Sequence, residues 1–289
     1  MNDNTNDKRN PYINSDDQRE LRKSIIAFID VLGFKELVRK AKNEDKSQEA
    51  LLNFHQALSS WHKREEEYYK TTFKMPFIGG KNDKYKIRIF TDCILIGCPI
   101  SKSGGNYNFI EGCDEFFDML STIYLLQVEM VNQGYFVRGA IVVDELYMDE
   151  VIIYGNGAIE AYEAEVNQAK YPRIILTKSA SSVLAEISKG FEDQQRENYI
   201  NKFFFKDSDG QIFLSYLESI KIGDHDFQFV GDLTKHKKII ELKLSEYQNN
   251  PHCLEKYLWV ANYHNNFCNQ PPYYNDYRID LTPYHMRPI

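Results

Sequence analysis

Two aspartates interrupt segments that are otherwise apolar. Residues 25–34 read IIAFIDVLGF with Asp30 as their only charge, and residues 87–97 read IRIFTDCILIG with Asp92 near the middle. A carboxylate is costly to bury unless a cation or a hydrogen-bond donor pairs with it. Two carboxylates on β-prone segments therefore predict a shared divalent cation, and hard oxygen ligands favour Mg²⁺ or Mn²⁺. Such a cation indicates an enzyme that acts on phosphates.

Each aspartate also has a plainer interpretation as a residue at a strand end or in a turn. Asp92 lies between two strand-like segments, and aspartate is common in turns because its side chain hydrogen-bonds to nearby backbone N–H groups. The metal interpretation requires the two strands to be neighbours in one sheet, which their separation along the chain permits.

The composition excludes several other classes of function. The 289-residue chain has a net charge of −7 and no dense basic block, so nucleic-acid binding is not expected. The seven histidines lack the spacing of a zinc site. The five cysteines, odd in number and without CxxC spacing, indicate reduced thiols in a cytoplasmic protein. Neither an apolar signal segment nor a membrane-spanning run of about 18 apolar residues is visible.

Hydrophobic periodicity predicts an α+β or α/β protein whose mixed sheet is covered by helices, and α+β is the class that we expect. The strands are expected over residues 24–32, 85–90, 94–98, 135–144, 146–154, 173–177, 203–206 and 211–216. The helices are expected over residues 34–42, 47–69, 109–133, 155–169, 179–189 and, in two pieces broken near 249–251, 232–268.

The character of the sequence divides the chain into three parts. Residues 1–20 are rich in Asn, Asp and Lys and poor in large apolar side chains, which predicts disorder. Residues 21–220 are expected to form the domain that carries both aspartates. Residues 221–289 are expected to form a helical C-terminal extension, which either packs on its own core, caps the sheet or extends an interface.

Four motifs, in order, resemble the catalytic domain of the class III nucleotidyl cyclases. Residues 28–34 (FIDVLGF) resemble the family's F-x-D-I-x-G-F strand and turn, and residues 87–92 (IRIFTD) resemble its K-x-x-G-D hairpin. Residues 135–141 are similar to the strand that carries R-x-G-I, and residues 154–177 to the segment in which a Trp-Gly-Asn turn starts a helix. The fold that this resemblance implies has a ferredoxin-like, palm-type core.

The segments FIDVLGF, GAIEAYEAE, YPRI and KYLWVANYHN further resemble the bacterial pyrimidine cyclases of the Pycsar antiphage systems. This resemblance implies conversion of UTP or CTP to the 3′,5′-cyclic monophosphate and pyrophosphate. It also implies a homodimer with active sites at its interface, and a cyclic nucleotide that signals to a separate effector. The sequence leaves open the choice between UTP and CTP, and the signal that activates the enzyme.

The resemblance assigns roles to particular residues. Asp30, Asp92 and the Val31 carbonyl would bind two Mn²⁺ or Mg²⁺ ions, which lower the pKa of the ribose 3′-hydroxyl and neutralise the charge on the leaving pyrophosphate. Arg138 and Lys206 would contact the polyphosphate. For both of these cations, an ordinary solvated position on a strand or hairpin is the alternative.

Two more residues are candidates for substrate binding. Arg88 lies four residues before Asp92, where adenylyl members of the family carry a lysine that reads the base, and a guanidinium suits the oxygen acceptors of a pyrimidine. Phe34 closes the first motif and is the second candidate. A plain strand position is the alternative for Arg88.

One position departs from the family pattern. Purine cyclases place an Asn and, four residues later, a transition-state Arg where this sequence has Ile159 and Glu163. Either another cation replaces that arginine, with Lys170, Arg173 and Arg88 as candidates, or the enzyme relies more on its metal ions, or the chain is inactive. Glu163 and Glu165 are also explained as the solvated face of a helix.

Three alternatives to a pyrimidine cyclase remain. The first is a purine cyclase that acts on ATP or GTP. The second is a catalytically inactive cyclase-like domain that binds a nucleotide and signals by interaction, which Glu163 supports. The third and weakest is a cyclic dinucleotide synthase with a related palm core, although no GG[DE]EF-like segment is present.

Overall fold

The structure is a computed structural model that describes residues 10–72, 84–101, 112–193, 200–220, 226–270 and 274–285. Its strands are β1 (Arg22–Val31), β2 (Lys86–Phe90), β3 (Cys93–Pro99), β4 (Val137–Met148), β5 (Ile153–Tyr154), β6 (Ile174–Leu176), β7 (Phe204–Lys206) and β8 (Ile212–Leu214). Its helices are α1 (Phe34–Asn43), α2 (Ser47–Thr72), α3 (Cys113–Asn132), α4 (Asn156–Gln168), α5 (Lys178–Lys189), α7 (Leu217–Ile220), α8 (Asp226–Glu246), α9 (Pro251–Cys268), η3 (Asn275–Tyr277) and α10 (Thr282–His285).

The strands form one mixed sheet in the order β2-β3-β1-β4-β6-β8-β7, with β5 paired to β4 outside this path. Within it, β1 pairs antiparallel with both β3 and β4, and β2 pairs antiparallel with β3. This β-α-β-β-α-β arrangement is the ferredoxin-like core expected from the sequence. Strands β4 and β6 pair in parallel, which makes the sheet mixed. The α+β fold class is therefore confirmed.

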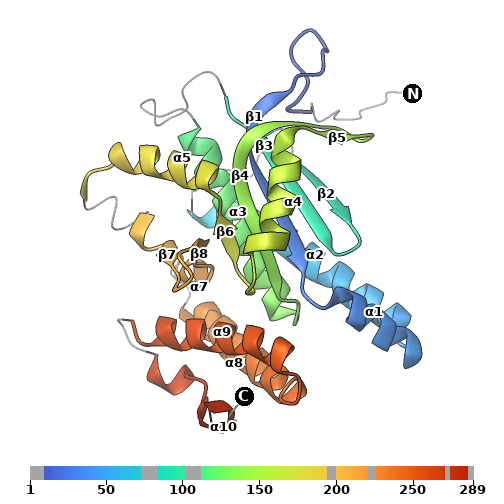
Figure 1. Ribbon diagram of the computed structural model, residues 1–289, viewed down its shortest axis with the longest axis vertical. Coiled ribbons are helices and arrows are strands. Elements are labelled where there is room, and N and C mark those ends of the chain that lie inside the picture. The colour runs from blue at the N-terminus through green and yellow to red at the C-terminus, as the bar shows by residue number, and fades with distance from the viewer. Residues whose placement is uncertain are drawn as a thin grey trace.

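The two faces of the sheet are buried under different helices. Because side chains alternate along a strand, Ile25, Ala27 and Ile29 face the large core under α2 and α3, whereas Ile26 and Phe28 face a smaller core under α4. Figure 1 shows α4 across one face of the sheet and α3 across the other. The same alternation places Asp30 on the face that α4 covers.

The C-terminal helices share the large core with the sheet. Leu233 and Ile240 of α8 and Val260 of α9 are completely buried in it. An ion-pair network also ties α8 to the helices beneath the sheet, because Arg64 of α2 pairs with both Glu129 of α3 and Asp232 of α8. In the described part of the chain, no helix combines the length and the apolar character needed to cross a bilayer.

The region after residue 144 differs from the prediction of a separate strand over residues 146–154. Strand β4 continues to Met148, and only Ile153 and Tyr154 pair back on it. The reason is a tight turn around Asp149, whose Oδ1 accepts hydrogen bonds of 2.8 Å from the N–H groups of both Val151 and Ile152.

The prediction of disorder over residues 1–20 does not hold for residues 10–20, and residues 1–9 lie outside the described part. Tyr12 is completely buried in the core under α4, and its hydroxyl hydrogen-bonds to Ser24 on β1 at 3.2 Å. Ile13 and Arg19 form an antiparallel bridge. The average composition of residues 1–20 is polar, and it therefore gives no indication that the single side chain of Tyr12 is buried in the core.

Close contact between β1 and β4 requires glycine at position 139, opposite Ile29. A Cβ at this position would lie 2.4 Å from the Phe28 carbonyl oxygen, which is backbone and cannot turn aside. We expect Gly139→Ala to lower the free energy of unfolding by about 1–3 kcal/mol, measured by urea denaturation. Gly231→Ala is the control, because a Cβ there meets no atom within 4 Å. Equal stability of the two variants would contradict this prediction.

Candidate functional site

Strand register places Asp30 at the centre of the candidate site. Asp30 stands near the end of β1, opposite Cys93 of β3 on one side and opposite Arg138 of β4 on the other. Directly opposed residues of an antiparallel pair project from the same face of the sheet, so all three side chains face α4.

Asp92 reaches the same place from the tight turn between β2 and β3. Thr91 precedes it with a φ of 54°, a left-handed conformation that is uncommon for a β-branched residue. The Thr91 hydroxyl lies 2.8 Å from Asp92 Oδ1, and the Val31 N–H donates a 2.9 Å hydrogen bond to the Asp92 carbonyl. This last bond joins the turn to the end of β1.

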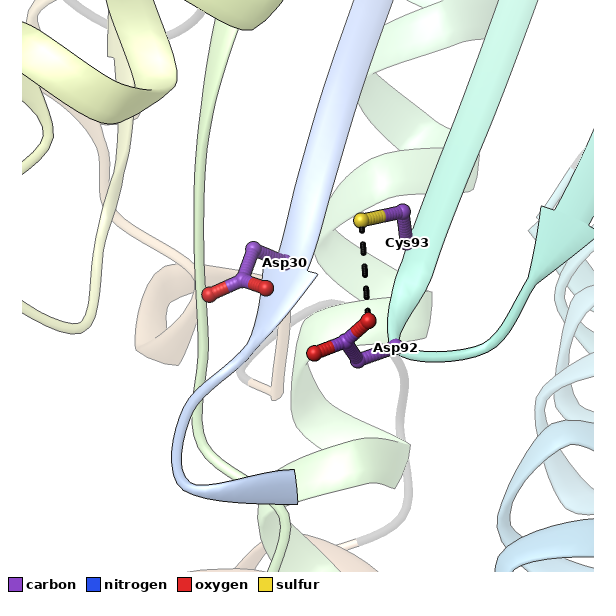
Figure 2. A group of neighbouring side chains, drawn as sticks. All are labelled: Asp30, Asp92 and Cys93. Atoms are coloured by element: carbon purple, nitrogen blue, oxygen red, sulfur yellow. Dashed lines mark hydrogen bonds between the residues drawn. The ribbon is translucent and has the colours of Figure 1, made fainter. Parts of the chain in front are cut away.

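The three side chains Asp30, Asp92 and Cys93 form a compact set of donors. One oxygen of each carboxylate and the Cys93 sulfur all lie within 4.8 Å of one another (Figure 2), and the thiol donates to Asp92 Oδ1 at 3.8 Å. Two carboxylates at this separation are suitable ligands for Mg²⁺ or Mn²⁺, and the thiol adds a softer donor. The donor set thus fits the divalent cation expected from the sequence.

Arg138 is anchored on three sides. Its Nε lies 3.3 Å from Asp30 Oδ2, its Nη2 lies 2.8 Å from Glu165 Oε1, and its Nη1 donates a 3.2 Å hydrogen bond to the Ala169 carbonyl. Glu165 comes from α4 and is only 3% exposed. One guanidinium is therefore shared between the sheet and the helix that covers it.

The site has an excess of negative charge. Burial raises the pKa of Glu165 to about 7, with Arg138 opposing this shift and Asp30 and Asp92 adding to it. Burial also raises the pKa of Asp30, and here Arg138 is the main opposing influence. Burial together with the nearby carboxylates raises the pKa of the Cys93 thiol to about 12. Each of these shifts disfavours the anionic form, so a bound cation would stabilise this centre.

Arg88 shares the Asp30 face of the sheet but is held elsewhere. Its guanidinium donates to the Asp149 carbonyl and pairs with Glu150 at 2.8 Å, both in the turn between β4 and β5. Its role in reading a base stays a prediction. In this structure Arg88 fastens the β4–β5 turn to β2.

Lys206 and Phe34 do not join the carboxylates. Lys206 is an exposed residue of β7, which is separated from β1 by β4, β6 and β8. Four strand spacings of about 4.8 Å put β7 roughly 19 Å from β1. Phe34 begins α1, and its ring packs on Phe54 of α2 at 5.0 Å. Their substrate-binding roles and the use of the Val31 carbonyl as a ligand stay predictions.

Arg173 and Lys170, the other candidates to replace the transition-state arginine, also form ion pairs with residues outside the carboxylate site. The Arg173 side chain is completely buried, pairs with Asp207 and Asp209 of the β7–β8 turn, and lies over the Trp259 ring at 5.4 Å. Lys170 pairs with Glu255 at 2.6 Å. Glu163 and Ile159 are both exposed on α4.

Sequence reasoning missed three residues at this centre. The helical spacing predicts a solvated face for both Glu163 and Glu165, but only Glu163 is exposed. Cys93 could have been found because it directly follows Asp92 in a strand. Burial raises the pKa of Asp30, and the charge of Lys256 on α9 is a minor opposing influence; Lys256 has no signal in the sequence because its position depends on how the C-terminal helices pack.

Comparison with known proteins gives little guidance. No protein-family model matches the chain, and no curated protein matches it. Among solved structures, it is similar to a class III adenylyl cyclase-like ATP-binding protein from Pseudomonas aeruginosa, with a TM-score of 0.39 and 10% sequence identity over 70% of this chain. The match spans 40% of that protein's chain. A likeness this distant does not assign a function.

The raised pKa of Glu165 predicts a pH-dependent stability. Glu165 keeps its proton to a higher pH in the folded state than in the unfolded chain, so between about pH 4.5 and pH 7 the folded state binds more protons. Stability therefore falls as pH rises through this window. Glu165→Gln should reduce this fall by on the order of 2 kcal/mol, measured by urea unfolding from pH 4.5 to 8 in chelator. Glu163→Gln, with the same charge change on the exposed face, should retain the wild-type pH profile.

Proposed function

We propose that the chain is a class III-type nucleotidyl cyclase that depends on Mn²⁺ or Mg²⁺. The observation that carries this proposal is the convergence of Asp30 and Asp92 from neighbouring strands of a ferredoxin-like sheet, with oxygen donors less than 4.8 Å apart. The two aspartates belong to the first two of the four motifs that resemble the family.

The reaction is an intramolecular phosphoryl transfer in which the ribose 3′-hydroxyl attacks the α-phosphorus and pyrophosphate leaves. Bound divalent cations supply the charge that activates the hydroxyl and stabilises the leaving group. Asp30 and Asp92 hold the cations at a fixed place on the sheet, and the Val31 carbonyl is a third candidate ligand. Arg138 contributes positive charge beside Asp30, where the polyphosphate of the substrate would lie.

The preferred substrate is a pyrimidine nucleoside triphosphate, UTP or CTP. The resemblance to the Pycsar cyclases supports this choice, and so does an arginine at position 88 in place of the lysine of adenylyl members. In the same proposal the cyclic product activates a separate effector in antiphage defence. Release of Arg88 from Glu150 would be needed for this residue to reach a base.

The active enzyme is proposed to be a homodimer. Large apolar side chains lie exposed on α4 and on neighbouring segments of the same face, and Phe90 and Tyr162 both contact the Phe28 ring between them. The exposed members are Phe90, Val151, Ile152, Ile153, Tyr154, Ile159, Tyr162 and Val166. We call this set the α4 patch. Several large apolar side chains exposed on one face of a protein are typical of a protein interface.

A nucleotide-binding domain without catalysis is the second candidate. It is favoured by the exposed Glu163 at the position of the family's transition-state arginine, and by the ion pairs that hold Arg88, Arg173 and Lys170 elsewhere. Lys256 of α9 and a cation from a second subunit are two further candidates to replace that arginine.

Incubation of the protein with each nucleoside triphosphate and Mn²⁺, followed by mass spectrometry, tests the activity. We expect a cyclic pyrimidine nucleotide and pyrophosphate as products. We expect Asp30→Asn and Asp92→Asn to lower the rate by roughly 100-fold or more, because a bound metal lowers the activation barrier by several kcal/mol. Full turnover by Asp92→Asn would refute the mechanism. Formation of cyclic AMP or cyclic GMP would support a cyclase but would show that its substrate is a purine nucleotide. Nucleotide binding without turnover would favour the second candidate.

Substitutions in the α4 patch test the homodimer. We expect Tyr162→Asp and Val166→Asp to convert a dimer into a monomer, because a carboxylate buried in an interface is strongly unfavourable. Light scattering after size-exclusion chromatography gives the mass directly. Leu242→Asp is the matched control, since Leu242 is an equally exposed apolar residue on α8, outside the patch. A wild-type monomer, or dimers of both patch variants, would contradict the proposal.

A further inference from the structure

Three carboxylates and one guanidinium meet at the candidate site. Asp30 of β1 and Glu165 of α4 both contact Arg138, while Asp92 joins Asp30 in the donor set. With every carboxylate ionised, these four groups carry a charge of −2, which equals the charge that one divalent cation would neutralise. The way in which Arg138 divides its contacts therefore bears on how strongly such a cation binds.

Arg138 and a cation compete for the same carboxylate. An arginine guanidinium forms its strongest pair with a carboxylate through two parallel hydrogen bonds. Arg138 makes no such pair with Asp30, because only its Nε approaches Asp30 Oδ2, at a long 3.3 Å. Its Nη2 is closer to Glu165, at 2.8 Å, and its Nη1 donates to the Ala169 carbonyl.

Helix α4 fixes this division of contacts. Glu165 projects from α4, and the Ala169 carbonyl lies at the C-terminal end of the same helix. The helix packs tightly on the sheet, because Ala161 and Ala164 are buried and a Cβ at Gly155, its N-cap, would lie 2.4 Å from the Glu145 carbonyl oxygen of β4. The two Arg138 contacts on α4 are thus fixed in place relative to β1 and β4.

We propose that Glu165 is a positioning residue that holds Arg138 away from Asp30 and so leaves the Asp30 carboxylate available to a divalent cation. This inference rests on the metal site of the proposed function. Glu165 acts through Arg138 and is not a ligand itself. Without the Glu165 charge, Arg138 rotates onto Asp30, forms a two-bond pair and opposes cation binding.

Mn²⁺ binding tests the inference without any need for turnover. The loss of the electron paramagnetic resonance signal of free Mn²⁺ reports binding to the wild type and to each variant at pH 8, above the raised pKa of Glu165. We expect Glu165→Gln to weaken Mn²⁺ affinity by about 10- to 100-fold, the usual cost of losing a residue that supports a metal ligand. Glu163→Gln is the matched control: it removes the same charge from the exposed face of α4 and should change the affinity by less than about twofold.

The decisive comparison uses Arg138→Gln. If Glu165 acts through Arg138, Arg138→Gln alone tightens Mn²⁺ binding, and adding Glu165→Gln in that background changes the affinity by less than about twofold. Circular dichroism and thermal unfolding establish that each variant is folded. If Glu165→Gln does not fold, Glu165→Asp, which keeps the charge but shortens its reach, is expected to weaken Mn²⁺ binding in the same direction.

Three results would overturn the inference. Equal losses from Glu165→Gln with and without Arg138 would show that Glu165 acts directly through its charge. Unchanged affinity in folded Glu165→Gln would show that Arg138 does not compete for Asp30. A wild type that binds no Mn²⁺ would remove the metal site of the proposed function together with this inference, whereas the first two results leave that metal site intact.

Discussion

The pairing of β1 between β3 and β4 determines the geometry of the candidate site. In this register Asp30 faces Cys93 on one neighbour and Arg138 on the other. A slip of one residue would turn Asp30 into the apolar core under α2 and α3, where its charge would have no partner. The apolar residues Ile25, Ala27 and Ile29, which fill that core, therefore hold the carboxylate in place from the opposite face.

A second constraint is electrostatic. A sheet face under a helix is an unfavourable place for carboxylates, and Arg138 neutralises only part of the charge of Asp30, Asp92 and Glu165. Burial is the main cause of the raised pKa values of Asp30 and Glu165, and the neighbouring carboxylates add to it. A fold stabilised only by its core would gain by replacing these residues with apolar ones. Retaining them is consistent with a site whose stability is completed by a bound cation.

The sequence predicts much of this site because each Asp stands alone in an apolar run. Asp30, Asp92 and Arg138 each interrupt a β-prone segment, and polar residues in such positions are informative because burial makes them costly. The strand order could not be derived from periodicity, although the ferredoxin-like core followed from the resemblance. The helical residues were harder, because Glu163 and Glu165 differ only in which side of α4 they occupy. Arg173 looked like an available cation, but its burial beside Asp207 and Trp259 depends on tertiary packing that no local pattern contains.

The C-terminal helices contribute both to the large core and to the charge around Asp30. Arg64 joins α8 to α2 and α3 through a largely buried ion-pair network, and the large core continues from the sheet into α8 and α9. Burial raises the pKa of Asp30 overall, and the charge of Lys256 on α9 opposes this shift less strongly than Arg138 does. The extension therefore contributes to the electrostatics of the carboxylate centre as well as to the core. A change in how α9 packs would alter the charge balance at Asp30 even if every residue on the sheet stayed in place.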